Sequence, residues 1–82
     1  MTKSPQLVAI GKAIRALREQ AGFSQEAFAV EVGLDRAYYG GVERGERNVA
    51  VLNLVKIAAA LGVEVGDLFP SIRTLEKERN RR

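Results

Sequence analysis

The 82-residue sequence contains no cysteine, no histidine and no tryptophan. Without cysteine the chain can form neither disulfides nor thiolate metal sites. Without histidine it lacks the commonest general base and metal ligand. No nucleophile–base pair, phosphate-binding loop or cluster of metal ligands is visible, and the neighbouring carboxylates Glu76 and Glu78 lie in a polar stretch. We therefore expect a binding protein that is not an enzyme and needs no metal or cofactor.

Long apolar runs are also missing. None approaches the roughly 18 residues that a membrane-spanning helix requires, and the first residues lack the pattern of a signal peptide. The composition, 46% hydrophobic and 28% charged residues, is typical of one soluble domain at this length. We expect a cytoplasmic protein with no membrane partner.

The net charge of +3 is concentrated at the C-terminus. Residues 73–82 contain five basic and two acidic side chains, whereas the other 72 residues contain equal numbers of each sign. Bulk basicity is therefore no argument for nucleic-acid binding, which must be argued from the placement of particular residues.

Apolar spacing and capping residues predict an all-α fold, and no strand pattern is visible. The predicted helices span about residues 5–20, 25–32, 36–44, 51–61 and 65–69. Ser4, Ser24 and Asp35 are suitable N-caps for the first three. The fourth helix is apolar nearly all round, so we expect it to be the buried centre of the fold. Residues 1–72 would form the domain, and 73–82 a basic tail with a frayed helical turn or two followed by disorder.

The second and third predicted helices, joined by a tight turn at Gly33, form a helix-turn-helix. In that motif the second helix enters the major groove of DNA. Gly40 and Gly41 stand in the middle of this helix, where each costs about 1 kcal/mol relative to alanine. Our interpretation is that they face outward and let the helix approach the bases closely. The alternative is that they relieve a clash with a neighbouring helix or a partner subunit.

Residues 23–48, FSQEAFAVEVGLDRAYYGGVERGERN, followed by LVKIAAALGVEVGDLF, resemble the Xre/Cro family of helix-turn-helix regulators. Within that family the chain looks most like the controller proteins of restriction–modification systems, over about residues 7–69. The resemblance implies a compact, five-helix, lambda-repressor-like domain. It also implies a homodimeric transcriptional regulator that binds a pseudo-palindromic operator in double-stranded DNA and controls its own gene and an endonuclease gene.

The resemblance implies which residues touch DNA. The base-reading positions match Arg36, Ala37 and Tyr38, to which the interpretation of the glycines adds Gly41. The phosphate-binding positions match Gln25, Arg44, Arg47 and Asn48. Arg36 would grip guanine O6 and N7 with two hydrogen bonds. Ala37 departs from the family, which often has a hydroxyl or amide there, and it allows only an apolar contact with a thymine methyl group. The alternatives are partial packing against the second helix for Tyr38 and a solvated surface for the arginines.

Two further features of the scaffold follow from the resemblance. Glu43 would face inward and pair with Arg18 of the first helix, locking the third helix against the first. Ala50 stands where the family usually has a serine or threonine cap for the fourth helix, so Asn48 or water would have to replace that cap. Tyr39 aligns with an apolar core position, and we expect it to be buried.

A dimer interface is predicted at the apolar residues left over after the core is built, Val65, Leu68, Phe69 and Ile72. The alternative is that Leu68 and Phe69 cap the core of the monomer. RNA polymerase would be a further partner of an activator. Glu26 lies in the region that some relatives use for this contact, although the helix dipole alone accounts for an acid there.

Two other functions stay open from the sequence. One is an antitoxin or phage repressor of the same fold. The other is a protein-interaction module that has lost DNA binding, against which the retained basic residues Arg36, Arg44 and Arg47 argue.

Overall fold

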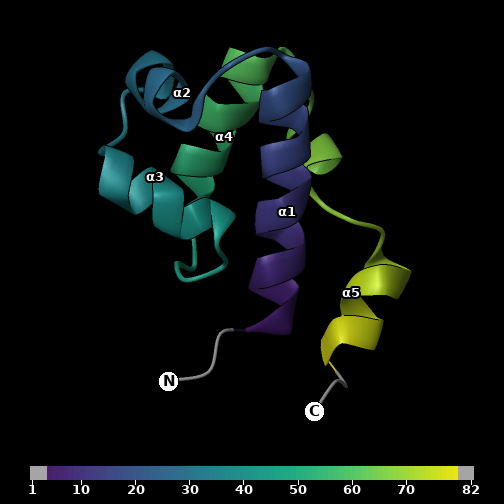
Figure 1. The fold of residues 1–82 in the computed structure, drawn as a ribbon. Helices are drawn as coiled ribbons and strands as arrows, with labels where there is room; N and C mark the ends of the chain where they lie inside the picture. The colour runs from purple at the N-terminus through teal and green to yellow at the C-terminus, as the bar shows by residue number, and fades with distance from the viewer. Residues whose placement is uncertain (1–3, 80–82) are drawn as a thin grey trace.

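The computed structural model describes residues 4–79, and within this range it consists of helices with no strand (Figure 1). The elements are α1 (Pro5–Gln20), α2 (Gln25–Val32), α3 (Arg36–Glu43), α4 (Val51–Leu61), the 3-10 helix η1 (Val65–Leu68) and α5 (Ile72–Arg79). The predicted all-α class is confirmed, and the first four helices agree with prediction to within one residue. The fifth predicted helix is the short η1. The disorder predicted for the end of the tail concerns residues 80–82, outside the described residues.

The predicted N-caps begin the first three helices. The side chain of Ser4 accepts a hydrogen bond from Leu7 N, Ser24 from Ala27 N, and Asp35 from Tyr38 N. Each bond satisfies an amide that the start of a helix leaves without a partner. Helix α4 begins after Ala50 without a side-chain cap from that residue.

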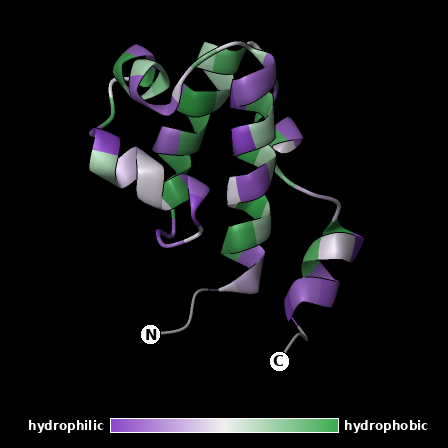
Figure 2. Cartoon of the chain, viewed as in Figure 1, coloured by the Kyte–Doolittle hydropathy of each residue, from purple (hydrophilic) through white to green (hydrophobic). Residues whose placement is uncertain are grey.

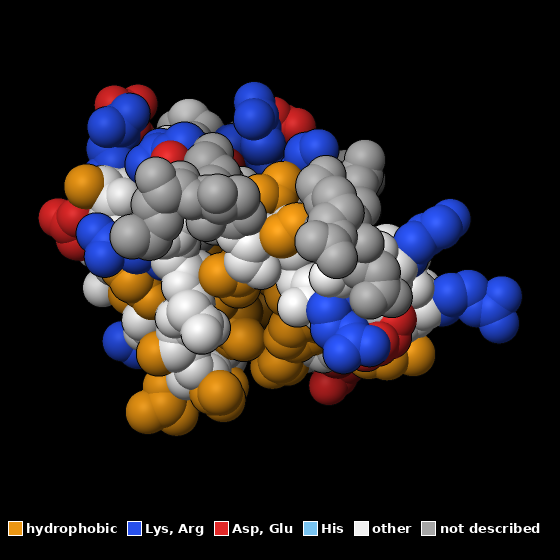
Figure 3. Space-filling view, turned by 90° about the horizontal axis from the view of Figure 1, so that it is seen from below, with side chains coloured by type: hydrophobic (Ala, Val, Ile, Leu, Met, Phe, Trp, Pro, Cys, Tyr) orange, Lys and Arg blue, Asp and Glu red, His pale blue; other side chains and the backbone are white. Residues whose placement is uncertain are grey.

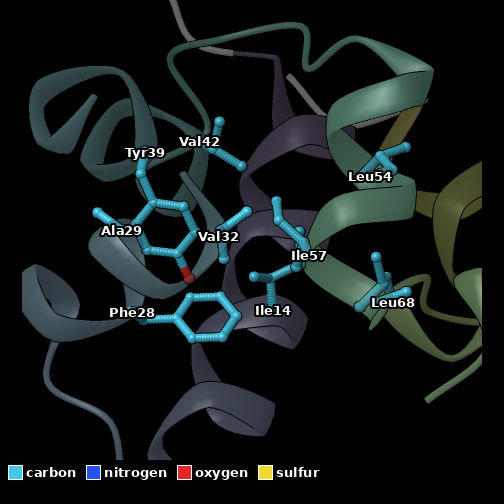
Figure 4. Close-up of a cluster of buried hydrophobic side chains, with 10 residues drawn as sticks. Ile14, Phe28, Ala29, Val32, Tyr39, Val42, Leu54, Ile57 and Leu68 are labelled. Atoms are coloured by element: carbon cyan, nitrogen blue, oxygen red, sulfur yellow. The ribbon is translucent and has the colours of Figure 1, made fainter. Parts of the chain in front are cut away.

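The core lies where α1, α2, α3, α4 and η1 meet (Figure 4). Its fully buried large side chains are Ile14, Phe28, Tyr39, Ile57 and Leu68. The rings of Phe28 and Tyr39 meet edge-on with centroids 5.4 Å apart, a geometry that aromatic pairs prefer. Tyr39 is therefore a core residue, as predicted.

The expectation that α4 is buried all round is wrong. Leu54, Ile57 and Ala58 are buried, but Val51 and Leu52 are about three-quarters exposed, at 71% and 75%, and Val55 is also exposed. The physical reason is that, within residues 4–79, α2 and η1 pack against only part of the helix surface and leave the side with Val51, Leu52 and Val55 exposed. Figure 2 shows α4 as the most continuously hydrophobic helix of the chain, although part of it faces outward.

Helices α1 and α3 approach closely because of Gly11 and Gly45. A Cβ atom on Gly11 would lie 2.4 Å from the carbonyl oxygen of Glu43, and one on Gly45 would lie 2.6 Å from the backbone of Val8. Gly45 also has φ +76°, in the left-handed region that favours glycine. The sequence alone assigned neither glycine a role in this contact.

Helix α5 lies beside the first part of α1 (Figure 1). The Gln6 side chain donates a hydrogen bond of 3.1 Å from Nε2 to the carbonyl oxygen of Leu75. None of the α5 residues is buried. The described part of the tail is thus a two-turn helix that packs on α1. The prediction from the sequence, a frayed end, did not include this packing. None of the helices in residues 4–79 is long and apolar enough to cross a membrane.

Candidate nucleic-acid interface

The helix-turn-helix is held in place by a buried ion pair between α1 and α3. The guanidinium of Arg18 makes two bonds to the Glu43 carboxylate, from Nε to Oε2 at 2.7 Å and from NH2 to Oε1 at 3.0 Å. Its third nitrogen, NH1, donates to the carbonyl oxygen of Phe23 in the loop between α1 and α2. The predicted pair therefore exists, and it also fixes the entry to α2.

Two more donors complete the surroundings of the Glu43 carboxylate. The Tyr39 hydroxyl donates to Oε2, and Gln25 Nε2 donates to Oε1 at 3.0 Å. Burial raises the pKa of Glu43, but the hydrogen bonds from Arg18, Tyr39 and Gln25 outweigh it and hold the pKa below its usual value. Burial and the same hydrogen bond raise the pKa of Tyr39. The carboxylate thus ties α1, α2 and α3 together as an anion.

The turn between α2 and α3 exposes the first residues of α3. Gly33 adopts φ +79° and ends α2, and Leu34 N donates to the carbonyl oxygen of Ala29 to close the turn. Arg36 and Ala37, the first two residues of α3, are both exposed. The Arg36 side chain lies beside Glu26 of α2, with Nε 3.5 Å from the carboxylate. These residues therefore have the outward placement that the base-reading prediction requires.

The prediction that Gly40 and Gly41 form a bare outer face is wrong for the free chain, because both are buried. A Cβ atom on Gly41 would meet Arg47 Cγ at 2.9 Å, and one on Gly40 would meet Arg44 NH1 at 3.0 Å and Gln25 Oε1 at 3.2 Å. The cover is thus made of long, flexible side chains. The two glycines give these side chains room to lie along α3, and Gly41 touches DNA only if Arg47 moves aside.

Tyr38 is half-buried and held from two sides. Asn53 of α4 donates a hydrogen bond of 3.2 Å to its hydroxyl, and the Arg47 guanidinium lies 5.8 Å from the centre of its ring. The second contact has cation–π geometry. The sequence interpretation missed Asn53, for which the only signal was its place as a polar residue in an apolar helix.

The four residues predicted to bind phosphate divide into two kinds. Arg44, Arg47 and Asn48 are exposed after the end of α3, and Arg44 pairs with Glu46 at 3.1 Å. Gln25 instead donates one N–H of its amide group to Glu43, which leaves the second N–H as a donor for another partner. Exposed pairs such as Arg44–Glu46 are weak, and phosphate groups can replace their carboxylates at little cost.

Only part of the predicted dimer interface is exposed. Leu68 is fully buried and belongs to the core of the protomer, so its assignment to the dimer interface is wrong. The alternative, that this residue caps the core of the monomer, is confirmed. Val65 is half-buried, whereas Phe69 and Ile72 are exposed. The exposed apolar residues of α4 were not predicted, because an all-round apolar helix does not reveal which face its neighbours leave open.

Comparison with known proteins agrees with this geometry. A family model described as Helix-turn-helix matches residues 14–68. The chain is 44% identical to the control protein C.MunI of a Mycoplasma species, over 87% of this chain and 93% of the relative. The crystal structure of the restriction–modification controller protein C.AhdI from Aeromonas hydrophila superimposes with a TM-score of 0.75 at 52% identity, covering 77% of this chain and 96% of that one. The biofilm regulator SinR, solved in complex with DNA, gives a TM-score of 0.69 at 32% identity, covering 72% and 95%.

Proposed function

The chain belongs to the helix-turn-helix family, and from that premise we propose that it is a controller protein of a restriction–modification system. It binds a pseudo-palindromic operator as a homodimer and regulates its own gene and an endonuclease gene. The observation that carries the proposal is Arg36, exposed at the first position of α3 directly after the Gly33 turn. Its proposed place of action is the cytoplasm, and as an activator it would also contact RNA polymerase.

Base reading is assigned to the start of α3. An arginine at this point reaches the floor of the major groove, where guanine O6 and N7 accept two hydrogen bonds from a guanidinium group. Ala37 beside it offers only a methyl group, which suits contact with a thymine methyl. Tyr38 presents a ring whose hydroxyl accepts a hydrogen bond from Asn53, a contact that does not depend on Arg47. Direct reading therefore depends mainly on Arg36, and Gly41 allows close approach once Arg47 moves.

Phosphate binding is assigned to both sides of α3. Gln25 lies at the first turn of α2, where free backbone amides add to the attraction for an anion. Arg44, Arg47 and Asn48 lie after the other end of α3. Contacts of this kind position a protein on the duplex without reading its sequence.

A single α3 reads too few bases to select one site in a genome, and paired half-sites solve this problem. We assign the dimer contact to the exposed apolar residues at α4 and after η1. They are Val51, Leu52, Val55, Phe69 and Ile72. Figure 3 shows hydrophobic side chains gathered toward one edge of the molecule when it is seen from below. Val65 would lie at the margin of this contact.

Sedimentation tests the dimer. At micromolar concentration we expect the mass of two chains for the wild type and of one chain for Leu52→Glu, because the carboxylate would be desolvated in the contact. Val30→Glu is the control, since Val30 is an apolar residue of similar exposure, 81% against 75% for Leu52, and lies on α2. A wild type that sediments as a single chain would refute the dimer.

DNA binding is tested with an operator selected from a pool of random duplexes by the wild-type chain. Arg36→Ala should lose discrimination between this operator and random DNA. Arg47→Ala should weaken both alike and reduce the salt slope by about one. Arg79→Ala is the control, because α5 lies on the other side of α1 from α3 (Figure 1). Equal discrimination by Arg36→Ala and the wild type would contradict the assigned base reader.

A further inference from the structure

One ion pair links the two helices of the motif on its exposed side. Glu26 is the second residue of α2, and Arg36 is the first residue of α3. The Glu26 Oε2 atom lies 3.5 Å from Arg36 Nε. Resting on the proposed function, we propose that Glu26 is a specificity-positioning residue: it holds Arg36 by Nε so that the two terminal nitrogens of the guanidinium face guanine.

The backbone positions of Glu26 and Arg36 relative to each other are set by the turn between their helices. The turn between the helices is closed by Gly33 in the left-handed conformation and by the bond from Leu34 N to the Ala29 carbonyl oxygen. The Asp35 cap fixes the first turn of α3. A carboxylate attached at this point of α2 is within reach of Arg36 and favours those Arg36 rotamers, among the many available, that point Nε toward Glu26.

The donor pattern of arginine determines what this contact leaves available. A guanidinium has five N–H donors and no acceptor. When Nε–H points toward Glu26, NH1 and NH2 remain for an end-on pair of bonds to guanine O6 and N7. The other approach to guanine, which uses Nε and one terminal nitrogen, is then disfavoured.

The strength of the contact depends on whether DNA is present. The two side chains are 62% and 71% exposed in the free chain, so water screens the pair and it orders Arg36 only weakly. In the major groove the same charges lose water, and their attraction grows as the local dielectric constant falls. Glu26 also repels phosphates that approach Arg36 without a matching guanine. Both effects favour the operator over random DNA.

The test is a double-mutant cycle between Glu26→Gln and Arg36→Ala, read as the ratio of affinities for the selected operator and for random duplex. We expect Glu26→Gln to reduce this ratio about three- to ten-fold in the wild-type background. In the Arg36→Ala background the same substitution should leave the ratio unchanged, because nothing is left to position. Glu31→Gln removes the same charge from the exposed far end of α2 and should change the ratio less than two-fold.

Three results would overturn the proposal. The first is an unchanged affinity ratio for Glu26→Gln while Arg36→Ala loses discrimination. This result would keep Arg36 as the base reader and refute only the positioning role of Glu26. The second is an equal loss in both backgrounds, which would mean that Glu26 touches the bases independently. The third is full discrimination by Arg36→Ala, which would refute the proposed base reader as well. Denaturation midpoints measured for every variant separate these outcomes from a loss of folding.

Discussion

Replacing Arg18 by alanine tests the scaffold that holds the helix-turn-helix. The side chain is only 8% exposed and makes three hydrogen bonds, two to Glu43 and one to the Phe23 carbonyl oxygen. Removing one partner of a buried ion pair typically costs about 3–5 kcal/mol, because the other charge stays buried. Here Tyr39 and Gln25 continue to donate to the carboxylate. We therefore expect the lower end of that range, about 3 kcal/mol.

A loss of this size is large for a chain of 82 residues, whose total stability is expected at about 4–12 kcal/mol. It should lower the melting temperature by about 12–24 °C. Urea unfolding followed by circular dichroism, at one fixed protein concentration, measures the change. The fixed concentration matters because a dimer's apparent stability depends on it.

The matched control is Arg15→Ala on the same helix. Arg15 also pairs with a glutamate, Glu19, at 3.3 Å, but its side chain is 62% exposed. Such a pair contributes about 0.3–0.5 kcal/mol. Similar unfolding midpoints for the Arg15 and Arg18 variants would refute the buried network as a determinant of stability.

Three further predictions follow from the packing and the electrostatics. Gly11→Ala should lower the free energy of unfolding by about 1–3 kcal/mol, because its Cβ would lie 2.4 Å from a backbone oxygen. Helix propensity alone predicts the opposite, a gain in stability. Gly66→Ala is the control, since a Cβ added there would meet no atom within 4 Å. Gly41→Ala should leave the chain folded and cost less stability than Gly11→Ala, since its Cβ would lie 2.9 Å from a side-chain atom, Arg47 Cγ, and not from the backbone; an equal fall in melting temperature would contradict this. Because the pKa of Glu43 is lowered in the folded chain, its carboxylate stabilises the fold at pH values above its unfolded pKa of about 4.5. The stability advantage of the wild type over Glu43→Gln should therefore shrink as the pH falls below that value. A constant difference in urea midpoints down to about pH 3 would contradict this.

Local sequence signals were enough to place both ends of α1, α2 and α4 and the start of α3. Ser4, Ser24 and Asp35 cap their helices through bonds to amides three residues away, and Gly33 ends α2 in its left-handed conformation. These are local interactions between residues close in the chain, so a single sequence contains them. The buried partner of Glu43 is 25 residues away and was identified only through the resemblance to a family.

Only the tertiary structure decided which surfaces are covered. Gly40 and Gly41 lie under arginine side chains, Leu68 lies inside the core, and Leu52 faces outward. Gly11 allows α1 to touch α3, although nothing near it in the sequence indicates that contact. The physical reason is that burial depends on which distant segment packs against a residue, and apolar spacing along one helix does not specify that neighbour.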